Sequence, residues 1–144
     1  MVQFGGDDRE TVSLFDKVQE ALDLISRVDP IRFSRIRKDM RRILIMGDLK
    51  VLGRQLIASS PDGLDGCFLD LDFLRMATVR RVAVVVVHEA THLRIDRARV
   101  KQPPSMRDRV EWVCMRAELS FARKLDDEFM AWLLRWHRAR SERD

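Results

Sequence analysis

The sequence Val82-Ala83-Val84-Val85-Val86-Val87-His88-Glu89-Ala90-Thr91-His92 joins an apolar run to two of the chain's three histidines. On an α-helix, residues four apart lie one above the other, so His88 and His92 would direct both imidazoles toward one ion. Neutral imidazole nitrogens bind borderline metals such as Zn²⁺. Glu89 sits about a quarter turn from His88, where it could accept a proton without being a ligand. The H-E-x-x-H pattern therefore predicts a helix that carries a metal site.

The apolar run before His88 has a local preference for strand, because five of its six residues are β-branched valines. It is far shorter than the roughly 20 residues that cross a membrane. A histidine on an apolar helix is often a core residue with no ligand. However, burying two imidazoles and a carboxylate without partners costs free energy, which a metal ion would offset. We expect a buried helix from about Thr78 to Ile95 or Asp96.

Length and composition predict a single globular domain over residues 1–144, with a frayed tail over residues 1–8. The two cysteines, Cys67 and Cys114, follow no metal-pair or redox spacing, and we expect both to be reduced and buried. Reduced cysteines suggest a cytoplasmic protein. The first residues are polar and acidic where a secretory leader would be basic and then apolar. We therefore expect no membrane partner.

Positive charge gathers in residues 32–42, within a chain of net charge +4. Such a cluster is one feature of nucleic-acid-binding proteins. Acidic residues are interspersed elsewhere, and no nucleic-acid-binding motif accompanies the charge. The favoured interpretation is a solvated helix face, and nucleic acid is not the expected partner. The basic residues of this segment are Arg32, Arg35, Arg37, Lys38, Arg41 and Arg42.

Apolar residues at helical spacing predict a first helix from about Glu10 to Val28. Asp29 then provides a cap, and Pro30 the first position, of a second helix that ends near Arg41. Short apolar runs at 42–46, 51–58 and 67–73 predict two or three strands in a small antiparallel sheet, with Asp70 and Asp72 on its polar face. The fold class is therefore α+β. The second helix is expected to bury Ile31, Phe33, Ile36 and Met40.

A loop is expected over residues 97–104, because Pro103 and Pro104 prevent a helix from continuing. Ser105 and Asp108 form a capping-box pattern that predicts the next helix start. Asp126-Asp127 predicts a break before a last helix at 129–136, followed by a charged tail from Arg138. The expected core stripe of the capped helix is Val110, Val113, Cys114, Ala117, Phe121 and Leu125.

A catalytic zinc ion normally has three protein ligands and one open position, so a third ligand must come from outside the motif helix. Glu111 and Glu118 are the candidates, because they lie almost on one line at the edge of the predicted core stripe. They are about 10 Å apart along the helix, so only one of them can contact a single ion. Either could instead be an exposed glutamate on a helix flank.

These residues resemble the zincin metalloproteases, and in particular the gluzincins, of which thermolysin is one. In that family the helix after H-E-x-x-H supplies a glutamate ligand at a similar distance to Glu111, which lies nineteen residues after His92. The segment from His88 to Leu125 is also similar to small bacterial proteins with an H-E-A-T-H motif. The resemblance implies Zn²⁺ bound by His88, His92 and Glu111, with Glu118 as its supporting partner or substitute. It also implies Glu89 as general base and a peptide or protein substrate that pairs with an edge strand.

The chain also departs from the gluzincin pattern. The acidic residue that follows the ligand glutamate by four positions is replaced by Met115, and the chain contains no tyrosine to stabilise an oxyanion. Arg107, Arg109 or His137 could take that second role. The sequence therefore predicts a zinc metallopeptidase. The alternative is a non-catalytic zinc-binding protein, or a module whose basic face binds nucleic acid or an acidic partner.

Overall fold

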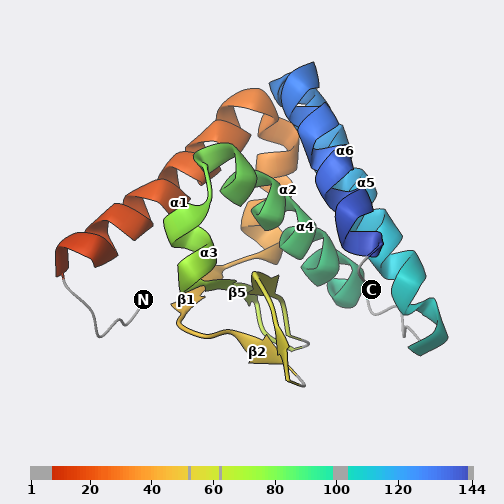
Figure 1. The fold of residues 1–144 in the computed structure, drawn as a ribbon, viewed down its shortest axis with the longest axis horizontal. Coiled ribbons are helices and arrows are strands. Elements are labelled where there is room, and N and C mark those ends of the chain that lie inside the picture. The colour runs from red at the N-terminus through yellow and green to blue at the C-terminus, as the bar shows by residue number, and fades with distance from the viewer. Residues whose placement is uncertain (1–7, 52, 62, 99–103, 143–144) are drawn as a thin grey trace.

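The computed structural model describes residues 8–51, 53–61, 63–98 and 104–142 (Figure 1). Helices predominate in these ranges and short strands form a small mixed sheet, which confirms the predicted α+β fold class. Within the described ranges, no helix combines the length and the apolar character needed to cross a membrane. The predicted N-terminal tail lies outside the described residues except for Asp8, which begins the first helix.

Two helices open the described chain. Helix α1 (Asp8–Val28) agrees with the predicted amphipathic helix, and α2 (Pro30–Asp39) begins as predicted. The Asp29 carboxylate accepts a hydrogen bond from the backbone nitrogen of Arg32 at 3.2 Å, which caps α2. The prediction that Ile31 is buried is wrong, since it is 69% exposed. Ile36 and Met40 are buried as predicted. Ile31 lies five residues before Ile36, which places it well round the helix from that buried side.

The sheet is mixed rather than antiparallel, which corrects the prediction. Strands β1 (Arg42–Met46) and β5 (Gly66–Asp70) pair in parallel, and β4 (Ala58–Ser59) pairs antiparallel with β5 at the edge. Residues 47–65 supply more than the dozen or so residues that a parallel crossover needs. Strands β2 (Lys50–Val51) and β3 (Arg54–Gln55) form a separate two-stranded hairpin.

The strand predicted to reach residue 73 ends at Asp70, where α3 (Leu71–Met76) begins. Asp70 is buried, and its carboxylate accepts hydrogen bonds from the backbone nitrogens of Phe73 at 3.1 Å and Leu49 at 3.0 Å. The first of these bonds caps α3. Asp70 and Asp72 therefore do not form the polar face of a strand, because the cap turns the chain into a helix between them.

Helix α4 (Val79–Arg97) contains the H-E-x-x-H motif and confirms the predicted motif helix. The Thr78 hydroxyl caps it by accepting a hydrogen bond from the backbone nitrogen of Arg81 at 3.2 Å. Every residue from 81 to 87 is buried, so the valine run is helical and buried as predicted. α4 packs against α1, α2, α5 and β5, as its central position in Figure 1 indicates. Burial on all these sides outweighs the strand preference of valine.

Helix α5 (Arg107–Leu125) packs against α4, and α6 (Asp127–Ser141) packs against α5 (Figure 1). A 3₁₀ turn, η1 (Pro104–Met106), precedes α5. The predicted Ser105 capping box is wrong, because this turn takes up Ser105 and α5 begins at Arg107 without a side-chain cap. Of the predicted loop, Arg97 belongs to α4 and residues 99–103 lie outside the described residues.

The predicted break at Asp126 is confirmed, since its carboxylate accepts a hydrogen bond from the backbone nitrogen of Phe129 at 2.6 Å and caps α6. α6 continues through the predicted tail to Ser141. Val113, predicted in the core, is 41% exposed, whereas Cys114 and Phe121 of the same helix are fully buried. The core of α5 is therefore narrower than the sequence pattern suggested, and it faces α4.

Candidate metal centre

His88 and His92 lie one turn apart on α4, where the buried valine run ends and the helix faces α5. Their ring centroids are 5.0 Å apart. Each imidazole is mostly buried and keeps a small exposed fraction. The i, i+4 spacing thus places the two rings together as the sequence predicted, in a position that solvent can still reach.

The Glu111 carboxylate bridges the two imidazoles from the first turns of α5. Its Oε1 lies 2.8 Å from His92 Nε2, and its Oε2 lies 3.3 Å from His88 Nε2. About half of the Glu111 side chain is exposed. The packing of α5 on α4 therefore brings the three residues expected to hold a metal within direct contact of one another.

Glu118 contacts the opposite side of the same His88 ring. Its Oε1 accepts a hydrogen bond from His88 Nδ1 at 2.5 Å, and its Oε2 accepts one from His137 Nε2 at 2.9 Å. The carboxylate is buried. Both candidate glutamates thus reach His88, but at different nitrogens and at different levels of α5, as their separation along the helix requires.

The His88 ring has a carboxylate acceptor next to each of its two nitrogens. Because Glu118 is an acceptor, the Nδ1 of His88 carries the hydrogen, and a neutral ring then presents a lone pair at Nε2. That lone pair would face the Glu111 carboxylate, another acceptor, at 3.3 Å. Either a second proton on the ring or a cation between the groups must relieve this contact. The arrangement therefore suits a metal ion, for which the donors are two nitrogens and a carboxylate.

The pKa values of His88, Glu111 and Glu118 show how these groups are charged when no metal is bound. Burial alone would lower the pKa of His88, but the hydrogen bonds to Glu111 and Glu118 outweigh it and raise that pKa to about 10. The hydrogen bonds to His88 and His92 hold the pKa of Glu111 well below its ordinary value. Burial raises the pKa of Glu118, yet the hydrogen bonds to His137 and His88 outweigh it and lower that pKa. In the absence of metal, a proton takes the place of the cation.

Glu89 is buried next to His88 and points toward the sheet. Burial raises the pKa of its carboxyl above the ordinary value, and the nearby charge of His88 and a hydrogen bond with the Ser60 side chain partly offset this. Ser60 directly follows the edge strand β4, which contacts α4. Glu89 is therefore held between the motif helix and the edge of the sheet, and it is not among the groups that bridge the imidazoles.

Sequence reasoning did not identify Cys114 as part of the cluster. Its Sγ and one ring nitrogen from each of His88 and His92 all lie within 4.8 Å of one another. Burial raises the pKa of this thiol, as do nearby carboxylates, Glu111 first. The signal in the sequence was the spacing, because residues three apart share a helix face and Cys114 follows Glu111 by three.

Arg81 was also missed. It is buried in the first turn of α4, and its guanidinium carbon lies 4.1 Å from the centre of the Trp136 ring on α6. Burial lowers the pKa of Arg81, while the nearby charge of Glu118 opposes that shift. The cation therefore offsets part of the charge of the buried Glu118 carboxylate, and it links α6 to the cluster.

Of the three residues proposed as transition-state stabilisers, His137 has different surroundings from Arg107 and Arg109, which are exposed. His137 directs its Nε2 at Glu118, so the geometry favours a role in holding that carboxylate over a role in stabilising an oxyanion. Arg109 lies exposed in the first turn of α5. Its predicted stabilising role stays a prediction.

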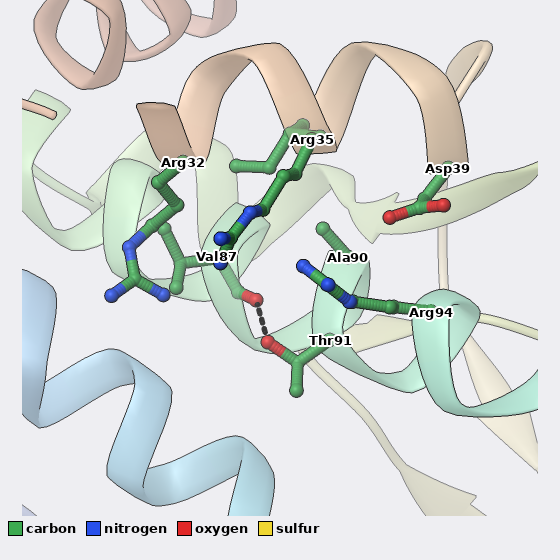
Figure 2. Close-up of a pocket in the computed structure, with 8 residues that line it drawn as sticks. Arg32, Arg35, Asp39, Val87, Ala90, Thr91 and Arg94 are labelled. Atoms are coloured by element: carbon green, nitrogen blue, oxygen red, sulfur yellow. Dashed lines mark hydrogen bonds between the residues drawn. The ribbon is translucent and has the colours of Figure 1, made fainter. Parts of the chain in front are cut away.

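A shallow basic hollow of about 40 Å³ lies between α2 and α4. Its lining includes Val87, Ala90 and Thr91, which lie on the side of α4 toward α2, whereas His88 and His92 face α5. The side chains of Arg35 and Arg94 extend into it from the two helices (Figure 2). This hollow corresponds to the basic segment noted in the sequence and is separate from the histidine cluster.

The chain matches no protein-family model, no curated protein and no solved structure in the comparisons made. The resemblance to zincins therefore rests on the motif and on the geometry of the cluster alone.

Proposed function

We propose that this chain is a zinc-dependent hydrolase that cleaves peptide bonds, with His88, His92 and Glu111 as the residues that hold the ion. The observation that carries the proposal is the contact of one carboxylate with the Nε2 atoms of both imidazoles, at 2.8 and 3.3 Å. One of these imidazoles already has its other nitrogen hydrogen-bonded to Glu118. A divalent cation satisfies all of these groups at once, and a mixed nitrogen and oxygen donor set favours zinc over the harder Ca²⁺ and Mg²⁺.

The supporting residues fit the same role. In metal sites a ligand histidine usually donates its second ring N–H to a carboxylate, which sets the tautomer and the ring orientation. Glu118 accepts such a bond from His88 at 2.5 Å and is itself held by His137 at 2.9 Å. In the gluzincin pattern, an acidic residue at the position of Met115 orients a histidine. Here Glu118 and His137 take that role.

Glu89 is the group we assign to proton transfer. A Zn²⁺ ion in the site would supply Lewis acidity, polarising the scissile carbonyl and acidifying water. Glu89 accepts the proton of the attacking water and later donates it to the nitrogen of the leaving amine. The raised pKa of its carboxyl, which burial causes, brings it closer to the working range of a general base near neutral pH.

The edge strand β4 is the element that we expect to bind an extended substrate. It pairs with β5 along one side only, as the last strand in the order β1-β5-β4. An edge strand offers free backbone groups to a peptide that adds to the sheet. Ser60, which follows β4, hydrogen-bonds to Glu89. A peptide paired with β4 would therefore lie beside the proposed base.

Elemental analysis of protein purified without added metal tests the ion. We expect about one zinc ion per chain, and we expect that content to be lost in His88→Ala and His92→Ala. Glu20→Gln is the control, because Glu20 is exposed on α1, away from the proposed ligands and the residues that support them. Wild-type protein that contains no zinc, and that does not bind added zinc, would refute the proposal.

The hydrolytic role needs a separate measurement. A mixture of quenched-fluorescent peptides should be cleaved by the zinc-loaded protein, and Glu89→Gln should lower that rate by about 10²–10⁴-fold while zinc stays bound. Loss of zinc from Glu89→Gln would show that Glu89 is a ligand. Stoichiometric zinc without any cleavage would favour the non-catalytic zinc-binding alternative.

A further inference from the structure

Cys114 brings a sulfur into the space shared by the two imidazoles. Its Sγ and one nitrogen from each of His88 and His92 all lie within 4.8 Å of one another. The ligand atoms of one tetrahedral zinc ion lie about 3.3–3.8 Å apart, given bonds of about 2.0–2.3 Å. These three donors therefore need to close by at most about 1–1.5 Å to share an ion.

Glu111 and Cys114 both approach the histidines from α5, but at different depths below the surface. They lie three residues apart on α5 and so share one face of that helix. The Glu111 side chain is 50% exposed, whereas Cys114 is completely buried. Glu111 therefore lies on the solvent side of the imidazole pair and Cys114 on the inner side. An ion between the imidazoles would have protein donors on both sides.

We propose that the Cys114 thiolate is a fourth protein ligand of the ion held by His88, His92 and Glu111. A neutral thiol is a weak hydrogen-bonding group, whereas a thiolate is a strong ligand for zinc. On metal binding, the sulfur forms the bond to the ion and its proton is released to solvent. This inference rests on the proposed function for the presence of the ion, and it adds a ligand that the gluzincin pattern does not contain.

The fourth ligand changes what the resting site can do. Four protein ligands fill a tetrahedral zinc site, whereas catalytic sites keep one position open. With Cys114 bound, the resting site is closed, and hydrolysis requires the thiolate to leave the ion. The rate of peptide cleavage by the wild type is then limited by the fraction of chains in which Cys114 has left the ion, and Cys114→Ala should cleave faster.

Cobalt substitution tests the ligand directly. Co²⁺ occupies zinc sites, and a thiolate bound to it produces a near-ultraviolet charge-transfer band that nitrogen and oxygen ligands do not produce. Titration of metal-free wild-type protein with Co²⁺ should give this band. Cys114→Ala should bind Co²⁺ through its three remaining ligands and lose the band completely. Cys114→Ser, which keeps nearly the same volume, guards against misfolding of the alanine variant.

Cys67 provides the matched control. It is as deeply buried as Cys114, but it lies on β5 with its Sγ 3.8 Å from the sulfur of Met40. Cys67→Ala should therefore keep the band. X-ray absorption on the zinc form should show a sulfur at about 2.3 Å in wild type and in Cys67→Ala only.

The outcomes separate the two proposals. Cobalt bound to wild type without the band, or a band that persists in Cys114→Ala, would overturn Cys114 as a ligand and leave the three-ligand zinc site intact. Failure of the wild type to bind either metal would overturn both proposals.

Discussion

Replacing Glu118 with glutamine tests the distinction between a ligand and its supporting carboxylate. The two oxygens of Glu118 accept hydrogen bonds from His88 Nδ1 at 2.5 Å and from His137 Nε2 at 2.9 Å. Glutamine has nearly the same size but only one acceptor oxygen, so its NH₂ group must face one of the two imidazole N–H donors. The substitution therefore disturbs the orientation of His88 but removes no ligand atom of the proposed metal ion.

The size of the effect follows from that geometry. Loss of a supporting carboxylate typically lowers metal affinity by about 10–100-fold, which corresponds to about 1.4–2.8 kcal/mol at 1.4 kcal/mol per tenfold change. Glu111→Gln removes a carboxylate that contacts both Nε2 atoms and should exceed this loss. We expect zinc affinity to fall in the order wild type, Glu118→Gln, Glu111→Gln.

Competition with a chromophoric chelator measures these affinities, at one fixed pH because protons compete with metal for the ligands. Glu20→Gln is the control, since Glu20 is exposed on α1 and should bind zinc as the wild type does. Circular dichroism of each metal-free variant checks that the fold persists. If Glu118→Gln loses more affinity than Glu111→Gln, the ion lies on the Nδ1 side of His88 and the assignment of ligands made above is wrong.

Three further predictions concern stability. In metal-free protein, the pKa of His88 is raised from 6.5 to about 10. The stabilisation that protonated His88 gives to the folded state is therefore complete below pH 6.5 and is lost as the pH rises through about 10. Urea unfolding with a chelator present should therefore show stability falling between these values, and His88→Gln should flatten that fall. Phe121→Ala empties a fully buried core position and should cost about 3–5 kcal/mol in urea unfolding, whereas the exposed Trp112→Ala should cost far less. Asp29→Ala removes the cap of α2 together with the ion pairs to Arg32 and Lys124, and thermal denaturation should show a loss of at least about 0.5–2 kcal/mol from the cap. Asp29→Asn keeps a capping oxygen and should cost less, so equal losses would contradict the cap as the main contribution.

Sequence by itself determined the features that depend on residues close together in the chain. The i, i+4 spacing of His88 and His92 requires only that their segment be helical. The caps at Asp29 and Asp126 use side chains that bond to backbone groups three residues later. The valine run could be assigned to a helix only because the motif that follows it needs one, since valine alone favours a strand.

Tertiary structure decided everything that depends on which segments meet. The parallel pairing of β1 with β5 and the hydrogen bond from the Leu49 backbone nitrogen to Asp70 depend on how the chain crosses between the two strands. The same holds at the cluster, where the register of α5 against α4 sets which nitrogen of His88 each glutamate contacts and brings Cys114 beside the imidazoles. Spacing along one helix places side chains on a common face, but the rotation and height of the partner helix depend on packing across the core, which no local pattern contains.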